Sequence, residues 1–292
     1  ADPPYWSGDI GQAFADALAE RARQGVKVHV LLDWVGSARM DERLAADMAQ
    51  AGVQVQRFHP PHWSHLGTHF NVQGPVVAQM QSVFIDNWIK VTGDVLHGPR
   101  YFPVLAASGA SSAQMFSSSP SGGSESMQLM YLLAITAASR SIDLSAAYFV
   151  PDPLTRQALA DALQRGVRLR IVLPGKHIDS DTVRGASRAT WGPLLAAGAT
   201  IAEYGPTMYH CKVMIVDGLL TSVGSTNFDN RSFRLNDEAT LNVIDPAFAA
   251  AQTAAFEADL ALARPVSHAD WLARPWRERA GDWLASLIGT QL

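Results

Sequence analysis

One stretch decides the fold: Tyr209-His210-Cys211-Lys212-Val213-Met214-Ile215-Val216-Asp217, followed by Gly224-Ser225-Thr226-Asn227. It predicts a β-strand, a turn at Asp217-Gly218 and a second strand. Because side chains alternate between the two faces of a strand, His210 and Lys212 are expected on one face, and Ser225 and Asn227 can also share one. Cys211 is then expected on the opposite face, as a core thiol. The four polar side chains together would form a site for a phosphate anion.

The composition is that of an ordinary globular protein. The 292 residues are 48% hydrophobic and 17% charged, which allows two domains with well-filled cores. The net charge of −4 argues against a nucleic-acid-binding protein, for which a basic face is typical. The single cysteine excludes an internal disulfide bond and any zinc site built from cysteines. No run reaches the roughly 18 apolar residues of a membrane span, and no secretory signal is evident at Ala1.

The chain contains one α/β unit twice. Gln12–Leu18 matches Gln157–Leu163, and Gln24–Leu32 matches Arg165–Leu173. The helices that end before Gly52 and Gly198 also correspond. In the first copy, helices are predicted over residues 10–23 and 40–50, and strands over 26–32 and 53–58. The alternation predicts an α/β fold of two repeats, each a largely parallel or mixed β-sheet flanked by helices.

The repeats predict the domain organisation. We expect the first repeat over residues 1–105, a Ser/Gly-rich connection over 106–126 with a strand at 113–116, and the second repeat over 127–264. A helical tail is expected over 265–292. The second repeat begins with an apolar core helix at 127–138.

The first repeat is shorter by about one motif block. In the second repeat, 34 positions lead from Pro206 to Thr240 and contain the quoted stretch, whereas seven lead from Pro61 to Thr68. Two explanations remain open: either the first repeat has lost its motif, or a segment that belongs between Gly67 and Thr68 is missing from this sequence. We favour the second, because a clean excision would remove a β-hairpin from the middle of a sheet.

The quoted stretch has the form H-x-K-x4-D and resembles the signature of the phospholipase D superfamily. An imidazole can act as a nucleophile or a general acid, and a lysine can neutralise charge on a phosphoryl group. The resemblance implies two repeats related by a pseudo-twofold axis, with one histidine from each meeting at the axis. One histidine attacks phosphorus to give a phosphohistidine and the other protonates the leaving alcohol, without a metal or cofactor. It makes the first-repeat histidine the nucleophile and His210 the acid.

Two carboxylates accompany this motif. Asp217 belongs to the catalytic signature by resemblance, but its position at a turn favours a role in holding the strands in register. Glu238, at the start of the next predicted strand, is by resemblance the acid that orients the histidine through its other ring nitrogen. The alternative for Glu238 is an ion pair with Arg231 or Arg234. Ser225 and Asn227 are expected to bind the substrate phosphate.

Two further stretches narrow the resemblance to bacterial cardiolipin synthases and phospholipase D-like proteins: Gly224–Phe233 with Asn236 and Glu238, and the tail with Arg274-Pro275-Trp276. This implies transfer or hydrolysis on a phospholipid such as phosphatidylglycerol, in a bacterial protein that is cytoplasmic or peripheral on the inner membrane. The alternatives are a nuclease of the same superfamily, disfavoured by the acidic balance and the two long repeats, and an inactive lipid-binding protein, which requires the first motif to be truly absent.

Other residues give weaker signals. Trp271, Trp276 and Trp283 recur at approximate helical spacing between arginines, which favours either contact with a membrane surface or a helix docked on the domain. Lys176–Asp179 follows a predicted strand at the end where α/β sites form, so it lines the entrance or is an exposed loop. His29 is expected to be structural. The loop histidines His59, His62, His65 and His69 do not have the spacing of a zinc site; they line the substrate mouth or are solvated.

Overall fold

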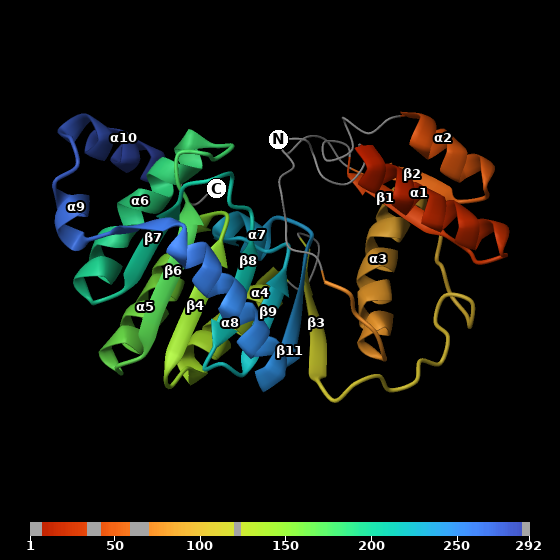
Figure 1. Ribbon diagram of the computed structural model, residues 1–292, viewed down its shortest axis with the longest axis horizontal. Coiled ribbons are helices and arrows are strands. Elements are labelled where there is room, and N and C mark those ends of the chain that lie inside the picture. Colours follow the sequence, from red (N-terminus) through yellow and green to blue (C-terminus); the bar gives the residue numbers. More distant parts are fainter. Residues whose placement is uncertain (1–7, 34–41, 59–69, 120–123, 288–292) are drawn as a thin grey trace. The chain divides into compact units, whose positions relative to one another are not determined.

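The computed structural model describes residues 8–33, 42–58, 70–119 and 124–287. The chain forms two compact units, one made of Ala1–Leu66 with Asn71–Ser108 and the other of Gly67–Phe70 with Gly109–Leu292. We call them unit 1 and unit 2. Helices and strands alternate in both (Figure 1), so the predicted α/β class is confirmed.

Unit 1 consists of three helices and one pair of strands among its described residues. They are α1 (Gly8–Arg23), β1 (His29–Asp33), α2 (Glu42–Gln50), β2 (Gln54–Phe58) and α3 (Val76–Thr92). β1 and β2 are parallel, with His29 opposite Gln54. The ring of His29 lies 4.9 Å from that of Trp88, as a structural role requires. The mixed sheet expected for the first repeat is not seen in this described part, which shows a parallel pair.

Unit 2 is built on a sheet of eight strands in the order β12-β7-β6-β4-β8-β9-β11-β3. Their bounds are β3 (Ser112–Ser118), β4 (Ser141–Ala146), β6 (Arg168–Pro174), β7 (Thr200–Tyr204), β8 (Lys212–Val216), β9 (Leu220–Gly224), β11 (Glu238–Ile244) and β12 (Ala263–Val266). β4, β6 and β7 are parallel to one another, and the other neighbours are antiparallel. The sheet is therefore mixed, as predicted for the second repeat.

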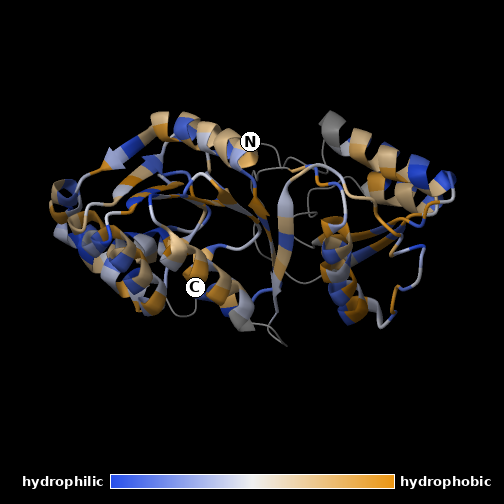
Figure 2. Cartoon of the chain, turned by 90° about the horizontal axis from the view of Figure 1, so that it is seen from below, coloured by the Kyte–Doolittle hydropathy of each residue, from blue (hydrophilic) through white to orange (hydrophobic). Residues whose placement is uncertain are grey.

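Helices cover both faces of this sheet. α8 (Pro246–Ala261) lies against one face, and α4 (Ser124–Ala137), α5 (Pro153–Gln164) and α6 (Asp181–Ala196) cover the other (Figure 2). Apolar side chains of the strands and of α4–α6 fill the space between them, with Ile142, Leu169 and Ile171 fully buried. The remaining elements are short: β5 (Phe149–Val150), β10 (Phe228–Asp229), α7 (Asn230–Arg234), α9 (His268–Leu272) and α10 (Trp276–Ser286).

The two units share a helix–glycine–strand corner. Gly25 and Gly52 in unit 1, and Gly166 and Gly198 in unit 2, have φ angles between 85° and 98°. At each corner, the amide of the residue after the glycine donates to a carbonyl five positions earlier in the helix. This left-handed conformation costs little for glycine alone. The series α1–β1–α2–β2 and α5–β6–α6–β7 are thus built alike, which supports one unit copied twice.

Candidate active site

Four strand ends meet at one end of the sheet in unit 2. Lys212 opens β8 opposite Ala146, the last residue of β4. Gly224 ends β9 opposite Thr240 of β11, and Glu238 opens β11. A Cβ atom on Gly224 would come within 2.2 Å of the Ala239 carbonyl oxygen, so only glycine permits this close approach. The sheet register therefore brings the predicted lysine and glutamate to the same end.

His210 and Lys212 are in direct contact. The Lys212 Nζ atom lies 3.0 Å from the ring nitrogens of His210, so the two side chains share a side as the sequence predicts. The strand begins at Lys212 rather than at Tyr209, and His210 belongs to the segment that leads into it. An ammonium group can donate only to a neutral imidazole. The contact therefore involves the neutral imidazole, and Lys212 must turn from the ring to a substrate phosphate before His210 can carry the proton that a general acid donates.

Lys212 has a depressed pKa because it is enclosed by the protein. Burial lowers its pKa to about 8, against the opposing effect of the Glu238, Asp179 and Asp229 carboxylates. An ammonium group with few water contacts interacts strongly with an anion that enters the site. Lys212 is therefore suited to hold a phosphate group.

Glu238 is a buried acid with a raised pKa. It is 8% exposed, and burial raises its pKa to about 7 although hydrogen bonds oppose the shift. The Ser225 Oγ donates to it at 2.5 Å and the Asn236 Nδ2 at 3.0 Å. Arg231 and Arg234 were the alternative ion-pair partners for Glu238. Arg231 donates to Asn236 at 3.3 Å, and Arg234 donates to Gln128 at 3.2 Å. The predicted orientation of His210 by Glu238 stays a prediction.

The two residues expected to bind phosphate differ in their surroundings. Ser225 is exposed, and its hydroxyl donates to Glu238 and accepts from the Ala239 amide at 3.0 Å. The Asn227 Oδ1 is buried and has no hydrogen-bond partner among the described residues. A buried polar atom without a partner is costly, and rotation of the amide would present its NH2 group instead. Asn227 therefore keeps hydrogen-bonding capacity for a ligand, whereas Ser225 supports Glu238.

The contacts of Asp217 are structural, and its inclusion among the catalytic residues stays a prediction. It lies at the opposite end of β8 from Lys212, with a φ angle of 55°. Its carboxylate accepts hydrogen bonds from the Ser139, Arg140 and Ser141 amides at 2.7 to 2.9 Å and from the Ser139 hydroxyl at 2.8 Å. Burial opposes ionisation, but these donors outweigh it and lower the pKa of Asp217. The aspartate fixes the start of β4 beside β8, as its turn position predicts.

Three residues near Lys212 are not identified by the sequence motif. The Tyr148 hydroxyl donates to Asp179, and burial and this contact raise the pKa of Tyr148. Asp229 is 3% exposed and caps α7 by accepting from the Ser232 amide at 2.7 Å; burial raises its pKa. Asp179 lies in the segment 176–179 that the strand-end argument identified. Tyr148 immediately precedes β5 and Asp229 ends β10, and the pairing of these two short strands has no signal in the sequence.

Cys211 and the three tail tryptophans differ in how far the protein buries them. Cys211 is half-buried rather than a core thiol. Trp271 is docked rather than free for a membrane: its indole Nε1 donates to the Arg188 carbonyl at 2.7 Å, and its ring lies on Gly192. Trp276 and Trp283 are 72% and 60% exposed.

The histidine loop 59–69 and the junction at Gly67-Thr68 lie outside the described residues. In the parts that are described, no three His, Cys, Asp or Glu side chains are grouped to hold a metal ion. No helix there has the length and apolar character needed to cross a bilayer.

Comparison with known proteins gives one consistent result. Residues 131–260 match the family model described as "Cardiolipin synthase, PLD-like domain". The cardiolipin synthase of Geobacillus kaustophilus is 31% identical over 330 residues, which covers 97% of this chain and 65% of that protein. Cardiolipin synthase A of Pseudomonas fluorescens strain Pf-5 is 30% identical over 322 residues, covering 96% and 67%. The chain thus spans about two thirds of the length of these relatives.

Two further details come from these comparisons. The matched stretch of 330 residues exceeds the 292 residues of this whole chain, so the Geobacillus protein has additional residues inside the matched region. The crystal structure of phosphatidylserine synthase from Haemophilus influenzae aligns with a TM-score of 0.63 over 96% of this chain and 93% of that one, at 12% identity. At this identity, the alignment shows a shared fold.

Proposed function

Because the chain belongs to the phospholipase D superfamily, and within it to the cardiolipin synthase-like proteins, we propose that it transfers or hydrolyses a phospholipid phosphodiester. The observation that carries the proposal is the 3.0 Å contact between Lys212 and His210 at the end of β8. It combines a proton-transfer group with a cation suited to phosphate. Phosphatidylglycerol is the proposed substrate, and the relatives are bacterial proteins.

The residues of unit 2 have distinct proposed roles. Lys212 neutralises charge on the phosphoryl oxygens, and Asn227 donates a further hydrogen bond. His210 gives a proton to the alkoxide as the bond between phosphorus and the leaving alcohol breaks. It then takes the proton of the incoming alcohol or water that displaces the enzyme nucleophile. Glu238 positions His210 and stabilises its protonated form.

The attacking group is proposed to be a histidine of the first repeat, placed across a pseudo-twofold axis. The bond between its ring nitrogen and phosphorus would form as the alcohol leaves, and would break when the acceptor attacks. The sequence has a single H-x-K-x4-D, at 210–217. The Geobacillus relative has additional residues inside the matched region, which supports a segment missing from this sequence; the proposal places that segment after Gly67.

A cavity among the helices of unit 2 suits a phospholipid. It has a volume of about 640 Å³ and lies between α4, α5, α6 and α7, with Pro151, Leu154 and Thr190 among its lining residues. Arg156 and Arg234 also line it. An apolar wall with two guanidinium groups can take both the acyl and the phosphate parts of an amphiphile. This favours a lipid over a nucleic acid as substrate.

Mass spectrometry of the products tests the proposal. The protein is incubated with phosphatidylglycerol: cardiolipin with glycerol indicates transfer, and phosphatidic acid indicates hydrolysis. His210→Asn is expected to lower turnover by about 10³-fold or more, whereas His97→Asn, at an exposed histidine of unit 1, serves as the matched control. Activity that survives in His210→Asn would overturn the site, and plasmid cleavage without lipid turnover would favour a nuclease.

The single motif also supports a second candidate, a lipid-binding protein without catalytic activity. If this second candidate is right, the chain binds phosphatidylglycerol vesicles but releases no product. Addition of the segment that the relatives carry would then decide between the two candidates. Turnover that appears only with the added segment would assign the nucleophile to it.

A further inference from the structure

The outer side of α10 carries an apolar stripe. Its members recur at positions i, i+4, i+7, i+8 and i+11, which places them on one side of a helix; they are Trp276, Ala280, Trp283, Leu284 and Leu287. All five are exposed, the two tryptophans at 72% and 60% and the two leucines at 58% and 59%. We call these five residues the apolar stripe.

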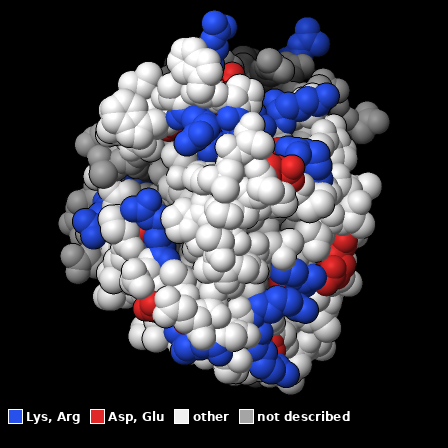
Figure 3. Space-filling view, turned by 90° about the vertical axis from the view of Figure 1, so that its left-hand side faces the viewer, with Lys and Arg blue, Asp and Glu red and all other residues white. Residues whose placement is uncertain are grey.

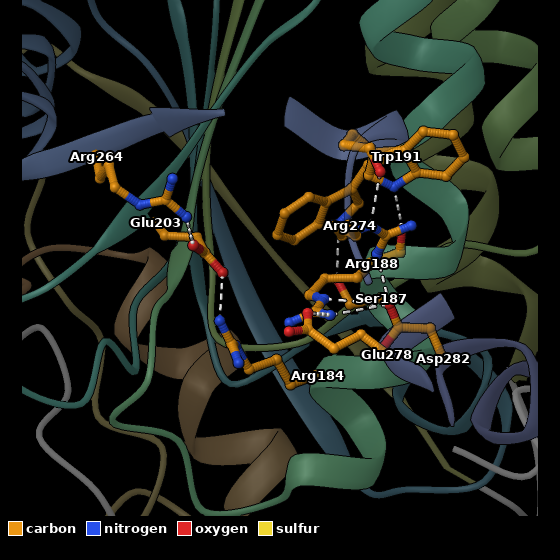
Figure 4. A network of polar contacts seen from close by, with 10 residues as sticks. Arg184, Ser187, Arg188, Trp191, Glu203, Arg264, Arg274, Glu278 and Asp282 are labelled. Carbon is orange, nitrogen blue, oxygen red and sulfur yellow. Dashed lines mark hydrogen bonds and ion pairs between the residues drawn. The ribbon is translucent and has the colours of Figure 1, made fainter. Parts of the chain in front are cut away.

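The polar side of α10 faces the protein. Asp282 is buried and pairs with Arg188 at 3.1 Å and with Arg274, and Glu278 pairs with Arg188 at 2.7 Å (Figure 4). Next to these ion pairs, Ala285 lies against Gly185 of α6. A surface helix normally buries its apolar side and exposes its polar side. α10 is reversed, so its apolar stripe is left for another partner.

Arginines border the stripe on both sides. At 100° per residue, Arg277 lies beside Leu284 and Arg279 beside Trp283. The Arg277 guanidinium lies 5.6 Å from the centre of the Trp276 ring. The acids of this helix, Glu278 and Asp282, are already paired with Arg188. On the face that Figure 3 shows, Lys and Arg side chains occur at several places and outnumber the visible Asp and Glu side chains.

We propose that the apolar stripe docks on an anionic phospholipid bilayer, with α10 lying in the plane of the interface. Tryptophan partitions to the boundary between headgroups and acyl chains, and arginine binds the phosphates of anionic lipids. The proposal rests on the proposed function, because an enzyme acting on phosphatidylglycerol draws its substrate from such a surface.

The docked helix also contacts elements that hold the active site. Ala285 packs against the cluster of Val150, Val183 and Ala186, on which Tyr148 also packs. Tyr148 in turn donates to Asp179, whose charge acts on Lys212.

The cavity among the helices of unit 2 is a second link between α10 and these elements. Ser286 of α10 and Asn230 of α7 line it together, and Asn230 follows the buried Asp229 in the chain. A bilayer on the apolar stripe would therefore border this cavity.

Sedimentation with vesicles tests the inference on the full chain. The protein is expected to bind vesicles of equal parts phosphatidylglycerol and phosphatidylcholine, and to bind pure phosphatidylcholine more weakly. Trp276→Ser with Trp283→Ser should lower the partition coefficient by at least about tenfold. Arg277→Gln with Arg279→Gln should lower it by about fivefold per arginine, and only on the anionic vesicles. Unchanged circular dichroism and melting temperature show that the variants fold.

The control replaces two exposed leucines outside the stripe, Leu219→Ser with Leu262→Ser, which are 44% and 59% exposed; it should bind within about twofold of the original protein. Wild-type binding by the tryptophan variant would overturn the inference. A second result would also overturn the inference: the original protein is a dimer, and the variant with both tryptophans replaced is a monomer. A second copy of the chain would then cover the stripe. Turnover of dissolved dihexanoyl-phosphatidylglycerol by the unaltered protein tests the proposed function separately.

Discussion

Substitution of Asp217 separates structural from catalytic roles within the H-x-K-x4-D motif. The carboxylate accepts four hydrogen bonds from the segment that opens β4, three from backbone amides and one from the Ser139 hydroxyl. Asp217→Asn keeps the oxygen that the Arg140 and Ser141 amides use. Its NH2 group replaces the oxygen that accepts from Ser139, so the Ser139 amide loses its partner.

The expected cost follows from these contacts. A hydrogen bond to a charged group contributes about 1.5–3 kcal/mol when buried, and Asp217 is only partly buried, so we expect Asp217→Asn to cost about 1–2 kcal/mol. Asp217→Ala removes all four contacts and also places alanine at a φ of 55°, which raises the cost to about 4 kcal/mol. In a unit of this size, 1 kcal/mol corresponds to about 2–4 °C in melting temperature.

Differential scanning calorimetry of the unfolding transition of unit 2 measures this loss of stability. The pKa of Asp217 is lowered in the folded state, so its contribution is present above the usual value of 3.8 and is lost as the pH falls through the lowered value. The difference between the original protein and Asp217→Asn should therefore be full at neutral pH and shrink in acid. An unchanged melting temperature combined with a 100-fold loss of turnover would refute the structural role.

Three further predictions concern the site and the tail. If turnover requires ionised Glu238 and protonated Lys212, its pH profile should rise through about 7 and fall through about 8, and a flat profile between pH 6 and 9 would exclude both roles. Lys212→Gln should lower turnover by about 10²-fold or more without unfolding the protein, as steady-state assays and circular dichroism can show. Gly192→Ala places a Cβ atom 2.4 Å from the Trp271 ring and should destabilise the docked tail by about 1–3 kcal/mol, seen as faster proteolysis after residue 264; unaltered digestion would contradict this packing.

The strand periodicity in the sequence was sufficient to predict that His210 and Lys212 lie on one side. The two side chains do meet, at 3.0 Å, but His210 precedes β8, so the contact also depends on the segment that leads into the strand. The helix–glycine–strand corners were equally predictable, because glycine at these positions is a local requirement. The short strand predicted at 113–116 is confirmed within β3, which extends from Ser112 to Ser118.

Other features depend on contacts between distant segments and were not predictable. Tyr148 and Asp179 meet only when β5 and the loop after β6 are placed together. The tail tryptophans have similar sequence surroundings, yet Trp271 is docked because Gly192 leaves room for its ring. Glu238 was identified by resemblance, but its link to Ser225 depends on the register between β9 and β11. The local sequence pattern predicts individual helices and strands. The site also depends on contacts between the ends of strands that are far apart in the sequence.

The short strand β12 has a consequence for how the protein behaves in concentrated solution. Without it, β7 would present an unpaired row of backbone donors and acceptors, the kind of edge along which chains join into aggregates. β12 covers that row, and Pro265 within it offers no amide to an incoming strand. Arg264 is held beside it by an ion pair with Glu203 at 2.5 Å. A protein shortened before Ala263 would therefore lose its protection against self-association as well as its tail.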